Sequence, residues 1–322
     1  MNIDHKLGYD IKKSTEEIFD QGVLSVYAPF SCAVRCPGCP SMDRLIYHKN
    51  PLGVFSAHIS WYIRSLGYNA ETVLITGADP AEAMSTDKIK RMSRDISNVE
   101  CQRFIIETCG QSHTNSLVAL AGAIDRPGCG VVRMRILGSL EWYDSTLKQA
   151  FSQFSAMDDS EIATLVANRI QAICANVETL HSGDSFIHTW DVGYEFITYL
   201  RPDMTLTELD SMAQQFKLRG DAHWILEPFV DCSNPEELAI TRVSNLDEVL
   251  KVTGATYRES RYSKDCTKEI TVTLKGEVSC ANVTENATNQ SNSTATTEPS
   301  PSSSAEATSQ QDSTSATANT QS

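Results

Sequence analysis

The sequence predicts an α/β protein built around a parallel β-sheet. Short apolar runs of strand length alternate with longer segments whose apolar residues recur at helical spacing. The run at 72–76 is continuously apolar, as in parallel strands that are covered on both faces. Such alternation implies parallel strands joined by right-handed crossovers. The six predicted strands are residues 23–28, 72–76, 103–108, 131–137, 194–200 and 223–226.

Helices are predicted before and between these strands. A short helix is expected at residues 14–20, because Ser14 and Thr15 can cap its start and Glu16 and Glu17 suit the positive end of its dipole. The spacing of apolar residues predicts further helices at 54–66, 87–96, 115–124, 139–153, 160–175 and 207–218. Residues 181–190 have no regular pattern, and we predict a loop that covers one mouth of the sheet.

The C-terminal part of the chain changes in character. Residues 234–252 have a helical pattern, and residues 269–274 alternate as a short strand does. Residues 281–322 are dominated by Ser, Thr, Ala, Asn and Gln, so they cannot bury enough apolar surface to offset their ordering entropy. The predicted organisation is an N-terminal lead-in (1–22), a main domain (23–233), a C-terminal extension (234–278) and a disordered tail (279–322).

Length and charge exclude some classes of protein. The 322 residues suffice for a sizeable core, so an enzyme is possible. Lys and Arg number 27 against 41 Asp and Glu, a net charge of −14, which argues against nucleic acid or an anionic membrane as the main partner. No apolar run approaches the roughly 18 residues that a membrane span needs. We therefore expect a soluble, cytoplasmic protein.

Three cysteines, Cys32, Cys36 and Cys39, follow the first predicted strand directly. Thiolates are soft ligands that suit zinc or iron–sulfur clusters. A structural zinc site usually closes with four protein ligands, so three thiols in a C-x3-C-x2-C loop indicate a metal centre that keeps one position open. The remaining cysteines are scattered, and we expect most of them to be small buried apolar residues.

A glycine-containing acidic turn follows the second predicted strand. It consists of Gly77, Ala78, Asp79 and Pro80. Ligand sites in parallel α/β sheets lie beyond the carboxyl ends of the strands. The cysteine loop and this turn should therefore face the same crevice.

Together the two motifs resemble the radical S-adenosylmethionine (SAM) superfamily, over about residues 23–230. Within it, Cys36-Pro37-Gly38-Cys39 with the turn after Thr76 is similar to the activating proteins of anaerobic ribonucleotide reductase and other glycyl radical enzymes. Two positions depart from that pattern, since Ala78 replaces the second glycine of the turn and Pro40 follows the last cysteine. The resemblance implies a partial (β/α)6 TIM-like barrel.

The resemblance also implies cofactors and partners. Cys32, Cys36 and Cys39 would bind three irons of a [4Fe–4S] cluster, and SAM would chelate the fourth. Reductive cleavage of SAM would give a 5′-deoxyadenosyl radical that abstracts hydrogen from the substrate. A flavodoxin or ferredoxin would supply the electron, and a glycyl radical enzyme would be the partner. The SAM amino group would be held by Gly77, Ala78, Asp79 and Pro80.

Further SAM contacts are predicted at the ends of later strands. Glu107 and Thr108 could meet the ribose, and Arg133 and Arg135 share one face of the fourth strand, from which an arginine could pair with the SAM carboxylate. Arg201, after the fifth strand, is a similar candidate. The competing interpretation is that all five are ordinary polar ends of strands. A structural role is expected for His181, His188, His223, Trp61 and Tyr62.

Two alternatives remain open. The thiols could form a zinc site that is completed by His48, Asp43 or a distant cysteine, and the protein would then be a binding module without catalysis. Alternatively, the protein could be a stand-alone radical SAM enzyme that acts on a small molecule, similar to the deazapurine-forming synthases.

Overall fold

The computed structural model describes the middle and much of the C-terminal half of the chain. The described residues are 19–20, 23–28, 71–77, 102–111, 117, 121–122, 124, 129–154, 156–182, 192–231, 237–260, 263 and 266–276. The chain divides into two units, Met1–Ser279 and Cys280–Ser322, and all described residues belong to the first. The helices predicted at 54–66 and 87–96, and the tail, lie outside the described residues.

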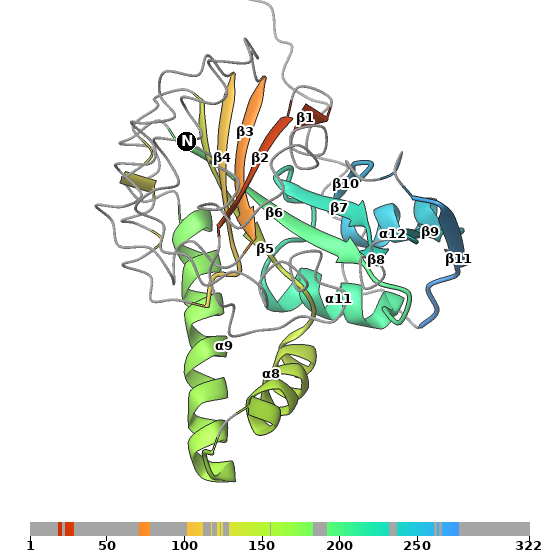
Figure 1. Ribbon diagram of the computed structural model, residues 1–322. Coiled ribbons are helices and arrows are strands. Elements are labelled where there is room, and N and C mark those ends of the chain that lie inside the picture. Colours follow the sequence, from red (N-terminus) through yellow and green to blue (C-terminus); the bar gives the residue numbers. More distant parts are fainter. Residues whose placement is uncertain are drawn as a thin grey trace, which may run out of the picture. The chain divides into compact units, whose positions relative to one another are not determined.

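An eight-stranded sheet forms the centre of the first unit (Figure 1). Its strands follow the order β1-β2-β3-β4-β5-β6-β7-β10. Neighbouring strands from β2 to β10 are all parallel, and β1 pairs antiparallel with β2. The bounds are β1 Phe19–Asp20, β2 Val23–Ala28, β3 Thr72–Gly77, β4 Arg103–Thr108, β5 Gly130–Arg135, β6 Gly193–Leu200, β7 Trp224–Pro228 and β10 Thr256–Tyr257.

All six predicted strands are confirmed as β2 to β7, and so is their parallel arrangement. Each new strand of this series is added on the same side of the previous one. Within the described residues, no strand pairing joins the two edges of the sheet. The α/β fold is therefore established, whereas closure into a partial barrel stays a prediction.

Four helices are described in full. They are α8 Leu140–Phe154, α9 Asp159–His181, α11 Leu206–Gln215 and α12 Leu246–Thr253. The helices predicted at 139–153, 160–175 and 207–218 are thereby confirmed. α9 is longer than expected and includes His181, so the predicted loop at 181–190 is wrong at its first residue; residues 183–190 lie outside the described part. None of the helices that the structure describes is long and apolar enough to cross a membrane.

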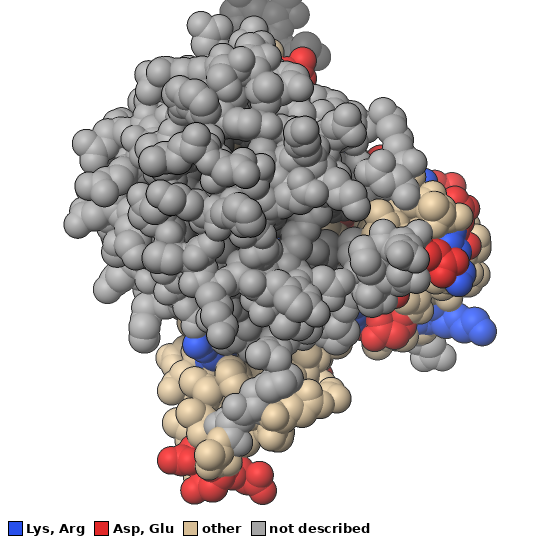
Figure 2. All heavy atoms as spheres, in the orientation of Figure 1, with Lys and Arg blue, Asp and Glu red and all other residues tan. Residues whose placement is uncertain are grey.

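Helices α8 and α9 pack against each other (Figure 1), and α9 begins with a capping box. The Asp158 carboxylate accepts hydrogen bonds from the backbone N–H of Ser160 and Glu161, both at 2.9 Å, and the Glu161 side chain accepts from the N–H of Asp158. These bonds satisfy N–H groups that a helix start leaves unpaired. Acidic side chains gather where the two helices join (Figure 2), and the exposed acids of that segment are Asp158, Asp159 and Glu161.

The hydrophobic core lies between one face of the sheet and the helices. Strand residues of the core include Phe104, Met134, Phe196 and Trp224, all fully buried. Helical residues of the same cluster are Tyr143, Leu147, Ile173, Val177, Leu180, Leu209, Met212 and Val249. Because residues of a strand point alternately to its two faces, only every second strand residue enters this core.

Two predicted helices contain strands instead. Phe19 and Asp20, the end of the helix expected at 14–20, form β1 and pair with β2. Residues Ala239–Val243, inside the helix expected at 234–252, form β9, which pairs with β8 (Val230–Asp231) and β11 (Lys268–Val272) in a second sheet. The β-branched Ile240, Thr241 and Val243 favour a strand, and pairing on both sides outweighs the weak helical pattern.

The remaining C-terminal predictions are confirmed in part. α12 occupies the second half of the helix expected at 234–252, and β11 corresponds to the strand expected at 269–274. Gly254 ends α12 with a φ of 67°, a left-handed conformation that favours glycine. Of the helix expected at 115–124, the structure describes only residues 117, 121 and 122 as helical.

Candidate functional site

Charged side chains line the face of the sheet opposite the hydrophobic core. The parallel register aligns Glu107 of β4 with Arg133 of β5 and with Glu195 of β6. All three are buried, with 3%, 7% and 5% of their surface exposed. We call this side the polar face and define it by its buried or half-buried polar residues, Thr76, Glu107, Arg133, Arg135, Glu195, Tyr199 and Glu227.

Arg133 is at the centre of the polar face. Its Nη1 atom lies 3.1 Å from Oε1 of Glu107, and its Nε donates to Oε1 of Glu195. Burial alone would lower the pKa of Arg133, but Glu107, Glu195 and Glu227 together raise it. The guanidinium therefore stays charged and holds two carboxylates from neighbouring strands in fixed positions.

The ion pairs continue toward β7. Arg258, directly after β10, lies 3.6 Å from Oε2 of Glu195 through Nη1, and its Nε donates to Oε1 of Glu227 at 2.7 Å. Arg103 lies 3.4 Å from Oε2 of Glu195 through Nη2. Burial would raise the pKa of the Glu195 carboxyl, but Arg133, Arg258 and Arg103 outweigh burial and lower it. A continuous line of alternating charges thus crosses β4, β5, β6 and β7.

Tyr199 lies on the same face, closer to the carboxyl end of β6. The register pairs it with Glu227 of β7. Burial raises the pKa of Tyr199, and the nearby carboxylates of Glu107 and Glu227 raise it further. The phenol therefore stays protonated and can donate a hydrogen bond to a ligand.

Thr76 connects the polar face to the acidic turn. Its hydroxyl, on a side chain that is buried, donates to Oε2 of Glu107. Gly77, the first residue of the turn, comes next and is the last residue of β3. The Glu107 carboxylate is itself held by Arg133, so this hydrogen bond fixes the base of the turn to the centre of the sheet.

The backbone register places the starts of the two predicted motifs at the same end of the sheet, where the strands have their carboxyl ends. β2 and β3 are parallel neighbours, and Ala28, the last residue of β2, is paired with Gly77. The cysteine loop and the acidic turn therefore leave adjacent strands, about 4.8 Å apart, at the same end. Cys32, Cys36, Cys39, Ala78, Asp79 and Pro80 themselves lie outside the described residues, so their ligand roles stay predictions. Within the described ranges, no three His, Cys, Asp or Glu side chains form a metal site.

The other predicted SAM contacts divide between the two faces. Glu107 and Thr108 were both candidates to meet the SAM ribose, and as successive strand residues they point to opposite faces of the sheet. Thr108 is fully buried, and its Oγ1 accepts a hydrogen bond from the N–H of Gly110 at 3.0 Å, which stabilises the turn after β4. Arg135 lies on the polar face with Arg133, as the alternation predicts, and is also buried.

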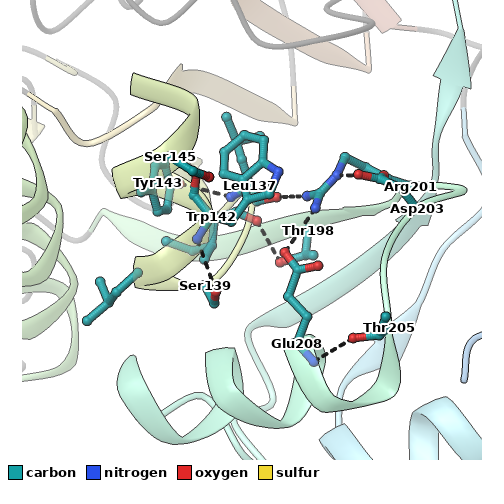
Figure 3. A network of polar contacts seen from close by, with 12 residues as sticks. Leu137, Ser139, Trp142, Tyr143, Ser145, Thr198, Arg201, Asp203, Thr205 and Glu208 are labelled. Carbon is teal, nitrogen blue, oxygen red and sulfur yellow. Dashed lines mark hydrogen bonds and ion pairs between the residues drawn. The ribbon is translucent and has the colours of Figure 1, made fainter. Parts of the chain in front are cut away.

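Arg201 lies in a network of polar contacts with side chains of α8 and α11 (Figure 3). Its Nη1 donates to the carbonyl of Leu137, its Nη2 donates to Glu208 of α11 at 2.9 Å, and its Nε donates to Asp203 at 3.2 Å. The guanidinium also lies 4.5 Å from the ring centre of Trp142 in α8. These contacts give Arg201 a role in holding the end of β6 to α8 and α11, and a contact between Arg201 and SAM stays a prediction.

Two of the three histidines have packing roles, as expected. His181 Nε2 lies 2.9 Å from Oδ2 of Asp221, which joins the end of α9 to the segment before β7. The ring of His223 packs on Tyr194 with 4.5 Å between the centroids. His188, Trp61 and Tyr62 lie outside the described residues.

Four charged residues of the site were not predicted from the sequence: Arg103, Glu195, Glu227 and Arg258. Glu195 and Glu227 are the charged residues of β6 and β7, which are otherwise made of apolar, aromatic and small side chains. A single charge inside a buried parallel strand is a signal that could have identified both. Arg258 carries no such signal, because only the pairing of β10 with β7 brings it to the polar face.

Comparison with known proteins gives limited information. No protein-family model matches the chain, and no curated protein matches it. Among solved structures, the chain is similar to coproporphyrinogen III oxidase (HemN) from Escherichia coli, described as a radical SAM enzyme, with a TM-score of 0.31 and 12% sequence identity. The match covers 66% of this chain and 45% of that chain, so this chain spans less than half of that structure. Similarity at this level does not identify a shared function.

Proposed function

We propose that this chain is a radical SAM enzyme with its active site at the carboxyl ends of β2 and β3. The observation that carries the proposal is the pairing of Ala28 with Gly77. Because of this pairing, the C-x3-C-x2-C loop and the glycine-containing acidic turn begin at the carboxyl ends of adjacent parallel strands. Binding sites in parallel sheets lie beyond these strand ends.

The donor set fits an iron–sulfur cluster. Cys32, Cys36 and Cys39 provide three soft thiolate ligands, and the fourth iron is left for SAM. Gly77 to Pro80 would bind the SAM amino group. When bound, the reduced cluster supplies the electron that cleaves SAM to methionine and a 5′-deoxyadenosyl radical.

The polar face would prepare the site for a charged ligand. Glu107 orients Thr76 and hence the turn, and Arg133 holds Glu107. Arg135 offers a buried cation on the same face, which suits the SAM carboxylate. Tyr199 adds a protonated hydroxyl. Thr76, Glu107 and Arg133 already hold one another in place and are buried, and shielding from water strengthens electrostatic interactions with a ligand.

The proposed radical target is a glycine of a partner polypeptide, so the protein would be a glycyl radical enzyme activase. The support is the likeness of the Cys36-Pro37-Gly38-Cys39 segment to such activases. A reducing cytoplasm and a flavodoxin or ferredoxin donor are part of this proposal. Recovery of a glycyl radical enzyme from an anaerobic pull-down would support it. SAM cleavage that is stimulated by a small molecule, without such a partner, would contradict it.

The enzyme proposal is tested by anaerobic reconstitution with iron and sulfide. Cys32→Ala, Cys36→Ala and Cys39→Ala should each remove iron, the brown colour and reductive SAM cleavage to 5′-deoxyadenosine. Cys174→Ala, a change of a half-buried thiol on α9, is the matched control and should retain all three. Asp79→Ala should weaken SAM use and spare the cluster. A colourless protein with stoichiometric zinc, or full iron content in all three variants, would refute the proposal.

A further inference from the structure

Gln111 has a buried side-chain amide that forms no hydrogen bond with the described residues. The residue is 3% exposed. Neither Nε2 nor Oε1 of its side chain has a hydrogen-bond partner in the part of the chain that the structure describes. An unpaired amide in the interior is costly, and native proteins pair nearly all such groups. This amide therefore suits a ligand that brings its own donor and acceptor.

The backbone around Gln111 is held firmly. Gly110 has a φ of 67°, and a side chain there would collide with Met134. The carbonyl of Gly110 accepts from Nδ2 of Asn176 at 2.7 Å, and the carbonyl of Gln111 accepts from Nη1 of Arg169 at 3.5 Å. Contacts with α9 thus fix the segment, and groups held in this way are suited to precise recognition.

Gln111 lies at the same end of the sheet as the proposed active site. It follows the end of β4, the strand between β3 and β5. β3 ends at Gly77, where the acidic turn begins, and β5 ends at Arg135. Because these strands are parallel, Gln111 lies beyond the carboxyl end of β4, at the same end of the sheet where the acidic turn and the cysteine loop begin.

We infer that the Gln111 amide binds the adenine ring of SAM, an inference that rests on the proposed function. A primary amide presents a donor beside an acceptor. Adenine presents the matching pair, its 6-amino group beside a ring nitrogen, and glutamine is known to bind this pair through two hydrogen bonds. The methionine end of SAM is charged and is assigned to the cluster and the acidic turn. The uncharged amide of Gln111 thus recognises the nucleoside end.

The test is Gln111→Met in the full-length, cluster-reconstituted protein, with anaerobic calorimetry. The dissociation constants for SAM and for 5′-deoxyadenosine should rise about 10-fold or more, because both hydrogen bonds to adenine are lost. The constant for free methionine should not change. The Tm of the ligand-free variant should rise by about 2 °C or more, because an unpaired buried amide is removed.

Gln215→Met is the matched control. The Gln215 amide is fully used, since Oε1 accepts from the N–H of Leu140 at 2.9 Å and Nε2 donates to Glu141 at 3.0 Å. The same substitution there should lower Tm and leave SAM binding unchanged. The two variants should therefore change Tm in opposite directions.

Other outcomes overturn the inference. A fall in the Tm of Gln111→Met, or unchanged affinity for SAM, would make the amide a structural group. A parallel loss of affinity for methionine would place it at the amino-acid end of SAM. Failure of the unmodified protein to bind SAM and 5′-deoxyadenosine would instead refute the proposed function, so the two failures can be distinguished.

Discussion

The two faces of the sheet are buried to a similar degree but are stabilised by different forces. On the apolar face, Phe196 and Trp224 are 0% exposed and pack in the core with the helices. On the polar face, Glu107, Arg133 and Glu195 are at most 7% exposed and are held by ion pairs. Burial of apolar area is favourable in almost any geometry, whereas a buried ion pair offsets its desolvation only in a defined one.

This difference bears on the role proposed for the polar face. Replacing buried ion pairs by well-packed apolar residues is often neutral or stabilising. A line of charges from β4 to the segment after β10 is therefore a poor choice for stability alone. Its hydrogen bond to Thr76, at the base of the acidic turn, gives a reason for its presence.

The largest effect is expected from breaking the polar face at its centre. Arg133→Met leaves the carboxylates of Glu107 and Glu195, on the two strands that flank β5, buried without their shared cation. The free energy of unfolding should fall by about 3–5 kcal/mol, the usual cost of removing one partner of a buried pair. Urea denaturation of the variant and the unmodified protein measures this difference.

A combined variant separates stability from function on this face. Glu107→Leu, Arg133→Met and Glu195→Leu together remove the charges rather than strand them. The free energy of unfolding should then return to within about 2 kcal/mol of the unmodified value, while SAM affinity falls because Thr76 loses its acceptor. Unchanged SAM affinity in this variant would show that the polar face serves stability only.

A smaller effect is expected on the apolar face. Trp224 is fully buried, and its Nε1 donates to Oγ1 of Thr198 at 3.1 Å. Trp224→Phe removes this bond and some volume, so the free energy of unfolding should fall by about 1–3 kcal/mol. Thr198 keeps its bond to the carbonyl of Ile136. SAM affinity should be unaffected, and a tenfold loss would contradict the division of roles between the faces.

Local patterns were sufficient to predict the strands of both faces. Short, largely apolar segments between helical patterns predicted all six parallel strands, and the alternation within 131–137 placed Arg133 and Arg135 on one face. The cysteine loop and the acidic turn were predicted to share an edge, and the register of β2 with β3 supports that placement. These inferences depend only on residues that are close in the sequence.

Interactions between distant segments could not be predicted in this way. β9 was taken for a helix because its strand character comes from pairing with β8 and β11. Arg201 was a candidate SAM contact, and its partners Glu208 of α11 and Trp142 of α8 come together around it only in the folded chain (Figure 3). That the described residues leave the Gln111 amide unpaired is likewise visible only in the folded chain.

The smallest effect is expected from titrating the polar face. Burial would raise the pKa of Glu195, but Arg133, Arg258 and Arg103 outweigh burial and hold it below its ordinary value. A carboxyl with a lowered folded pKa contributes stability above its unfolded pKa of about 4.3 and loses it as the pH falls through the folded value. The difference in the free energy of unfolding between the unmodified protein and Glu195→Gln, here called the stability gap, should thus be constant above about pH 5 and shrink at lower pH.

Trp224→Phe is the control, and its stability gap should not depend on pH, since this substitution changes no titrating group. Urea denaturation from neutral to acidic pH measures both gaps, and a gap for Glu195→Gln that persists in acid would show that its charge does not stabilise the polar face.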